Sequence, residues 1–128
     1  MDRDFVYKKR ILIIGEFCDA SINSTGLYFE DMAVGLSQSA NVVILSTAIG
    51  CRAKVSCEYY RKISMGSYYF PRLLRPLLIT LIFAVYARFM MRNIDAVIIG
   101  TNPYWLPLIT ASLPHKLPIL IWCFDLFP

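Results

Sequence analysis

Short runs of aliphatic, mostly β-branched residues recur along this chain, and they limit its fold more than any other feature. The runs occupy residues 11–15, 42–45, 96–100 and 118–123. Each run is too short for a typical helix and too continuously apolar for a strand with one face in water. Each therefore predicts a strand that is buried on both faces. Residues 59–65 mix aromatic and basic side chains, which predicts a further strand that is half exposed.

Segments with helical character separate these strands. In residues 29–36 the apolar positions follow the spacing i, i+3, i+4 and i+7, which predicts a helix with one stripe against a sheet, and Asn23, Ser24 and Thr25 are candidates for its N-cap. Residues 71–93 predict a second, more apolar helix, and residues 104–113 predict a short helix begun by proline. We expect residues 48–54 to form a loop. Strands that alternate with helices predict an α/β fold, with a mostly parallel sheet and helices on both faces.

Length and composition exclude several classes of protein. The chain has 128 residues, enough for one domain, and 57% of them are apolar, too many for a disordered segment. The net charge of +4 comes from basic residues that are scattered among apolar neighbours. This distribution argues against binding to nucleic acid, which needs clustered cations, and favours contact with a lipid surface. The four cysteines form no CxxC pair and lack zinc-ligand spacing to His115, so no metal site is predicted. Because the N-terminus lacks the apolar core of a signal peptide, we expect a cytoplasmic protein.

Ligands of a parallel sheet bind beyond the carboxyl ends of its strands, so the loops at those ends are expected to carry the site. These loops cover residues 15–26, 46–50, 100–104 and 124–128. The chain contains neither GxGxxG nor GxxxxGK(S/T), which argues against nicotinamide cofactors and P-loop nucleotide chemistry.

Polar residues in these loops suit a ligand, but each also has a simpler interpretation. Thr25 and Gly26 lie at a helix N-terminus, where backbone N–H groups can receive a phosphate or diphosphate; the pattern alone favours an ordinary helix cap. Asn102 and Pro103 lie in a loop that could bind sugar hydroxyl groups, although a simple turn is the better interpretation. Asp125 follows an apolar strand. It could act as a general base or accept hydrogen bonds from substrate hydroxyl groups, and it could equally be a helix-capping or turn-forming residue.

The helix predicted over residues 71–93 has no charge between residues 76 and 87 and arginines at both ends. Its 12 uncharged positions fall short of the length that spans a bilayer, about 20 residues. The helix either packs only against the sheet or also lies in a membrane interface, with its arginines at anionic headgroups. We favour the second arrangement, in which the membrane contacts are Arg72, Arg75, Phe83, Tyr86, Arg88 and Phe89.

Five sequence segments follow one another in a characteristic order. They read KRILIIG at 9–15, STGLYFEDMAVGL at 24–36, ANVVILST at 40–47, NIDAVIIGTNP at 93–103 and ILIWCFDLFP at 119–128. This succession resembles the N-terminal domain of family 4 glycosyltransferases with the GT-B fold, above all the members that build bacterial surface polysaccharides. The resemblance implies that residues 1–128 are a single Rossmann-like domain.

The resemblance also implies a function. Such a domain is the acceptor-binding half of an enzyme that transfers a sugar from a nucleotide-sugar to a lipid-linked or polysaccharide acceptor. The acceptor is at the inner face of the plasma membrane, and the nucleotide-sugar is a co-substrate, with no metal or other cofactor. In this family Thr25 and Gly26 would meet the donor diphosphate, Asn102 and Pro103 would bind the acceptor, and Asp125 would act in catalysis.

Four features depart from the family pattern. The first loop has Gly26 where many members have two glycines, Phe124 stands where members have a histidine, and Phe127 stands where they have a tryptophan. The chain also lacks the donor-binding domain, so we expect that domain in cis or on a partner chain, and no activity from this chain alone. Two alternatives are a non-catalytic, membrane-associated binding or scaffold module and a different Rossmann-like binding protein.

Overall fold

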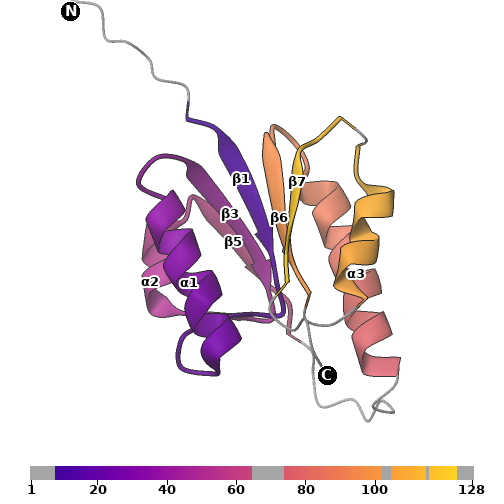
Figure 1. Ribbon diagram of the computed structural model, residues 1–128, viewed down its shortest axis with the longest axis horizontal. Coiled ribbons are helices and arrows are strands. Elements are labelled where there is room, and N and C mark those ends of the chain that lie inside the picture. Colours follow the sequence, from indigo (N-terminus) through magenta and orange to yellow (C-terminus); the bar gives the residue numbers. More distant parts are fainter. Residues whose placement is uncertain (1–7, 65–73, 102–104, 115, 124–128) are drawn as a thin grey trace, which may run out of the picture.

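The structure, a computed structural model, describes residues 8–64, 74–101, 105–114 and 116–123. Its centre is a five-stranded sheet with the order β5-β3-β1-β6-β7, in which each described pair of neighbours is parallel (Figure 1). The strands are β1 Arg10–Ile14, β3 Asn41–Ser46, β5 Tyr59–Lys62, β6 Ala96–Gly100 and β7 Ile119–Trp122. The predicted α/β, Rossmann-like fold is therefore confirmed.

Helices cover both faces of the sheet (Figure 1). On one face lie α1 (Ser24–Leu36) and α2 (Cys51–Ser56). On the other face lie α3 (Leu74–Met90) and the 3-10 helix η1 (Leu106–Ser112). The two helices predicted in the second half of the chain correspond to α3 and η1. Helix α1 begins directly after Asn23, one of the predicted N-cap candidates.

The central position of β1 explains why its sequence is apolar at successive positions. Leu12 and Ile14 belong to the core cluster beneath α3, whereas Ile13 belongs to the cluster beneath α1. All three side chains are completely buried. Since successive side chains of a strand point to opposite faces, a strand covered on both sides buries each of them.

Residues 48–54, predicted as a loop, contain regular structure instead. Ala48–Ile49 form β4, which pairs in parallel with β2 (Phe17–Cys18), and α2 follows directly. Helix α2 has six residues, and its N-cap is Gly50, which has no side chain to cap it. An acceptor for the α2 backbone comes from Glu30 on α1, which is distant in the sequence, so local residue patterns did not predict this helix.

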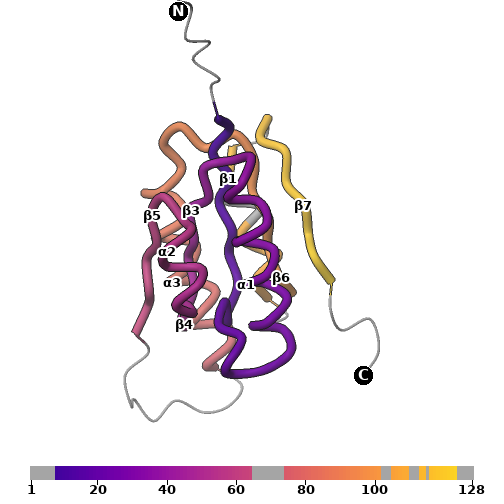
Figure 2. The backbone as a smooth tube through the Cα atoms, turned by 90° about the vertical axis from the view of Figure 1, so that its left-hand side faces the viewer, coloured from indigo at the N-terminus to yellow at the C-terminus, as the bar shows by residue number. Residues whose placement is uncertain are grey.

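Strand β7 forms one edge of the sheet, and its exposure corrects a prediction. Figure 2 looks onto the face covered by α1 and α2, with β5 and β7 at the two edges. Leu120 and Ile121 are 57% and 44% exposed, and Cys123, predicted as a buried strand position, is exposed. Within the described residues β7 pairs only with β6, and an apolar run at a sheet edge does not ensure burial.

Candidate functional site

The carboxyl ends of β1 and β3 are joined through Glu16, a residue that the sequence patterns did not single out. The backbone carbonyl of Glu16 accepts hydrogen bonds from the Thr47 N–H (3.0 Å), Ser46 Oγ (2.9 Å) and Thr47 Oγ1. One residue earlier, the Gly15 N–H donates to the Leu45 carbonyl at 3.2 Å. These bonds hold the start of the first loop against the end of β3.

The half-buried carboxyl group of Glu16 has an altered acidity. Burial raises its pKa from the usual value of 4.5, and the positive charge of Arg75 lowers it by a smaller amount. Arg75 lies in the first turn of α3, so α3 begins at this edge of the sheet. A partly buried carboxyl at the ligand-binding edge of a parallel sheet suits hydrogen bonding or proton exchange with a hydroxyl group. Its signal in the sequence is its position directly after the glycine that follows β1.

Thr25 and Gly26 lie in the first turn of α1, as predicted. The N-cap is Asn23, whose side-chain oxygen accepts a hydrogen bond from the Gly26 N–H at 2.7 Å. A Cβ at Gly26 would overlap the Asp19 carbonyl, so glycine allows the loop to pack against the helix. The contacts of Gly26 are thus those of an ordinary helix cap, which was the simpler interpretation of this sequence. Binding of a diphosphate at Thr25 and Gly26 stays a prediction.

Two glycines at the strand ends make room for an aromatic ring. A Cβ at Gly100 would lie 2.6 Å from Phe29 Cζ, and one at Gly15 would lie 3.3 Å from it. Phe29, on α1, is 1% exposed, and its ring centroid lies 6.1 Å from that of Trp122 on β7. The ring therefore packs α1 against the carboxyl ends of the strands, and these glycines serve the packing beneath the site.

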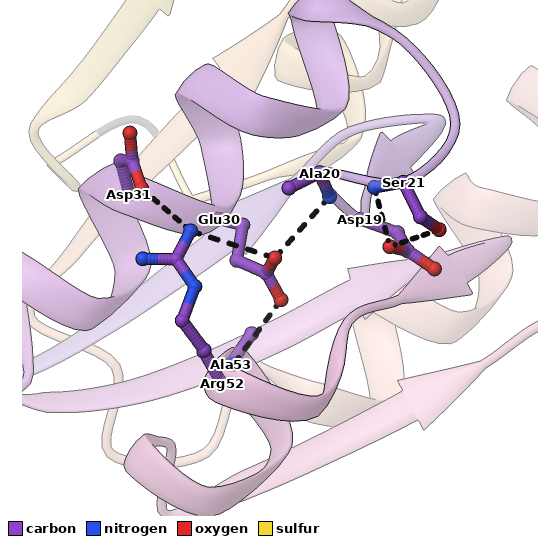
Figure 3. Close-up of polar contacts among 7 residues, drawn as sticks. All are labelled: Asp19, Ala20, Ser21, Glu30, Asp31, Arg52 and Ala53. Carbon is purple, nitrogen blue, oxygen red and sulfur yellow. Dashed lines mark hydrogen bonds and ion pairs between the residues drawn. The ribbon is translucent and has the colours of Figure 1, made fainter.

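A buried carboxylate supports the loops of this edge (Figure 3). Glu30 is 3% exposed; its Oε1 accepts the Ala20 N–H at 3.2 Å and its Oε2 accepts the Ala53 N–H at 3.3 Å. Arg52 Nη2 lies 3.6 Å from Glu30 Oε1 and 2.6 Å from Asp31 Oδ1. Glu30 therefore connects the first loop to the start of α2. Sequence reasoning missed it, because a glutamate within a helix usually faces solvent.

Asp19 shapes the same loop (Figure 3). Its Oδ1 accepts hydrogen bonds from the N–H and the hydroxyl of Ser21, at 3.0 and 2.8 Å. These two bonds lower the pKa of Asp19 below its usual value of 3.8. The carboxylate is therefore charged at neutral pH and holds a tight turn before α1.

The exposed side of α3 is apolar along most of its length. Leu77, Leu81, Val85 and Phe89 are spaced by four residues and are 41%, 56%, 57% and 81% exposed. Residues four apart lie on the same side of a helix, so these side chains form one row, which we call the α3 stripe. None of the helices in the described part of the chain is long and apolar enough to cross a bilayer.

The predicted membrane contacts divide into exposed and buried residues. Arg75, Arg88 and Phe89 are exposed, and Tyr86 is partly exposed. Phe83 is completely buried in the core cluster between α3 and the sheet. This is a correction to the prediction for Phe83, and its physical reason is that this position of the helix faces the sheet.

The remaining predicted site residues, Arg72, Asn102, Pro103 and Asp125, lie outside the described residues. Within the described ranges, no three His, Cys, Asp or Glu side chains gather as metal ligands would. No family model matches the chain, and no match is found among the curated proteins or among the solved structures.

Proposed function

We propose that this chain is the acceptor-binding domain of a GT-B glycosyltransferase of the family 4 type. Such a domain binds a lipid-linked or polysaccharide acceptor, while a donor-binding domain in cis or on a partner chain holds the nucleotide-sugar. The observation that carries the proposal is that the five segments of the resemblance coincide with β1, α1, β3, β6 and β7. Because the strands are parallel, the loops that follow them open at one edge, where ligands of such sheets bind.

In this proposal Glu16 contacts the acceptor. Its carboxyl group accepts a hydrogen bond from an acceptor hydroxyl, and its backbone is fixed to the end of β3. The raised pKa suits proton exchange with that hydroxyl. Thr25 contributes the positive end of α1 to the donor diphosphate. The resemblance gives Asn102 and Pro103 a role in acceptor binding and Asp125 a role in catalysis.

A lipid-linked acceptor implies a peripheral location at the inner face of the plasma membrane. The α3 stripe supports that location, because an exposed apolar row with basic residues nearby is typical of helices that lie in a membrane interface. Arg75 and Arg88 are the exposed basic residues on the same helix.

The proposal is tested by adding a short-chain polyprenyl-diphosphate sugar to the full chain and following backbone NMR signals. We expect shifts at residues 15–26 and at Thr101, and weaker binding by Glu16→Gln. The control Glu58→Gln removes an exposed carboxylate at the amino end of β5 and should leave binding unchanged. Absence of binding, or shifts confined to other surfaces, would contradict the proposal.

A sugar-transfer assay tests whether catalysis requires the donor-binding domain. The purified chain, mixed with nucleotide-sugars and the same acceptor, should form no product. Measurable sugar transfer without a donor-binding domain would show that this chain is more than an acceptor-binding half.

A membrane-associated scaffold without catalysis is the second candidate function, and the α3 stripe favours it. The scaffold requires vesicle binding but no acceptor site at the carboxyl edge. A chain that binds vesicles and leaves the NMR signals of residues 15–26 unchanged with the acceptor sugar would therefore be a scaffold.

A further inference from the structure

A groove lies between β5 and α3. It consists of two adjoining hollows, with volumes of about 460 and 610 Å³, which share Arg61 and Tyr86 as lining residues. The first hollow reaches Arg10 and Arg92, near the amino ends of the strands, and the second reaches Lys62 at the carboxyl end of β5. Both volumes are in the range of small-molecule sites, about 300–1000 Å³. We call this feature the β5–α3 groove.

The β5–α3 groove is positively charged. Arg10, Arg61, Lys62 and Arg92 line it. Glu58 forms an ion pair with Arg10 at 3.1 Å, but in the described part of the chain no ion pair involves the other three cations. Arg61 and Arg92 therefore create a positive potential in the groove that favours an anionic ligand, whereas the charge of Lys62 acts on Asp19 in the first loop and lowers the pKa of that carboxyl.

Arg61 is held in a defined position within the groove. Its guanidinium carbon lies 5.1 Å from the centroid of the Tyr86 ring. An arginine restrained over an aromatic ring loses less side-chain entropy when it binds a phosphate, and its planar group can donate two parallel hydrogen bonds.

The α3 stripe borders this charged groove. Val85 lines the second hollow and Phe89 lines the first, and both side chains are mostly exposed. Helix α3 has 17 residues and so extends about 25 Å beside the groove. Basic and apolar surfaces thus run side by side, which matches a ligand with an acidic head and an apolar tail.

We propose that the β5–α3 groove binds the headgroups of anionic phospholipids at a bilayer surface while the α3 stripe enters the acyl boundary. The lipid phosphate contacts Arg61 and Arg92, and Phe89 packs against the first acyl carbons. The proposal adds Arg61 and Arg92 to the membrane-facing residues. It rests on the peripheral location in the proposed function, and not on glycosyl transfer.

The orientation of α3 gives this contact a consequence for the acceptor. Arg10 Nη1 donates to the Arg92 carbonyl at 3.0 Å, so the end of α3 lies near the start of β1, whereas Arg75 at its beginning acts on Glu16. A membrane in contact with the whole stripe therefore reaches the carboxyl edge of the sheet, where a lipid-linked acceptor would enter.

Vesicle flotation of the full chain tests the groove. We expect binding to vesicles of equal parts phosphatidylcholine and phosphatidylglycerol, and much weaker binding to phosphatidylcholine alone. Arg61→Gln/Arg92→Gln should lower the partition coefficient on the anionic vesicles by about 25-fold, since each basic residue at the surface contributes roughly fivefold. The matched control Lys54→Gln/Lys116→Gln removes the same charge from exposed positions outside the groove and should lower it by about threefold or less. Circular dichroism checks that each variant is folded.

Several results would overturn the proposal. They are wild-type binding by Arg61→Gln/Arg92→Gln, an equal loss in the control, or equal binding to both kinds of vesicle. Soluble glycerol phosphate separates the lipid surface from free phosphate: displacement of the chain from vesicles at millimolar concentration would assign the groove to a soluble ligand. Preference for an acidic amphipathic peptide over vesicles would assign it to a protein partner. None of these results bears on acceptor binding at residues 15–26, which the NMR experiment under the proposed function tests separately.

Discussion

Glu30 occupies the space that a side chain at residue 50 would need, since a Cβ on Gly50 would overlap Glu30 Oε2. Because residue 50 is glycine, the carboxylate reaches the start of α2 and accepts the Ala53 N–H at 3.3 Å. Ala53 is the third residue of α2, the position whose N–H an N-cap side chain normally binds. Glu30 and Gly50 thus form one helix cap from two separate elements.

Gly50→Ala should destabilise the chain by about 2–3 kcal/mol, because the added methyl group displaces a buried, hydrogen-bonded carboxylate. Urea unfolding followed by circular dichroism measures the change. Gly35→Ala on α1 is the matched control: nothing lies within 4 Å of a Cβ built there, and alanine should stabilise the helix by about 0.5 kcal/mol. Equal effects of the two substitutions would contradict the Glu30–Gly50 contact.

Glu30→Gln should lower the free energy of unfolding by about 1–3 kcal/mol. The amide nitrogen must face either the Ala20 or the Ala53 N–H, which leaves a buried donor without an acceptor. Asp31→Asn, the neighbouring change, affects a side chain that is 52% exposed and should cost less than about 1 kcal/mol. The prediction fails if the two variants unfold at the same urea concentration.

Gly100→Ala should cost about 1–3 kcal/mol, because the new methyl group would lie 2.6 Å from Phe29 Cζ. Gly15→Ala, with a contact of 3.3 Å, should cost less. A double-mutant cycle with Phe29→Leu measures the coupling: the smaller side chain should relieve part of the cost of Gly100→Ala. Purely additive effects would show that the ring and the glycine are not in contact.

The Glu16 carboxyl should make stability depend on pH. Its pKa in the folded chain is raised, so folding favours the protonated form; this contribution is complete below pH 4.5, the usual value, and is lost as the pH rises through the folded pKa. Glu16→Gln should therefore be more stable than the parent chain at pH 7, and the difference should vanish toward pH 4. Urea unfolding over this pH range measures it.

Arg75→Gln provides a second measurement on the same group. Removing the positive charge should raise the pKa of Glu16 further, whereas Arg88→Gln, at the other end of α3, should leave it unchanged. The carboxyl carbon signal of Glu16 in an NMR titration reports this pKa. A downward shift in Arg75→Gln would contradict the electrostatic assignment.

The buried strands were predictable because a strand that is covered on both faces needs apolar residues at successive positions, and such runs are visible in the sequence. Strand β1 was predicted over residues 11–15 and occupies Arg10–Ile14, and the strands over 42–45 and 96–100 agree as closely with β3 and β6. The start of α1 was predictable for a local reason, since Asn23 caps it through its own side chain.

Features that depend on contacts between distant residues were not predictable. Helix α2 depends on Glu30, which is 23 positions from the N–H that it accepts. The acidity of Glu16 depends on burial by elements that are distant in the chain. Phe83 was assigned to lipid because an apolar helix does not reveal which of its sides faces the sheet.

The bonds at the end of β1 determine which part of the first loop can rearrange. Beyond Glu16, Phe17 pairs with Ala48, and the Cys18 carbonyl accepts the Gly50 N–H at 2.9 Å. The backbone from β1 to Cys18 is thus tied to the segment after β3 at successive residues. The Ala20 N–H is in turn bonded to Glu30 on α1 at 3.2 Å, so a closing movement of α1 over a ligand has to bend the backbone next to Cys18 and carry the following turn with it. Any force that a ligand applies before that point is transmitted to two strands together.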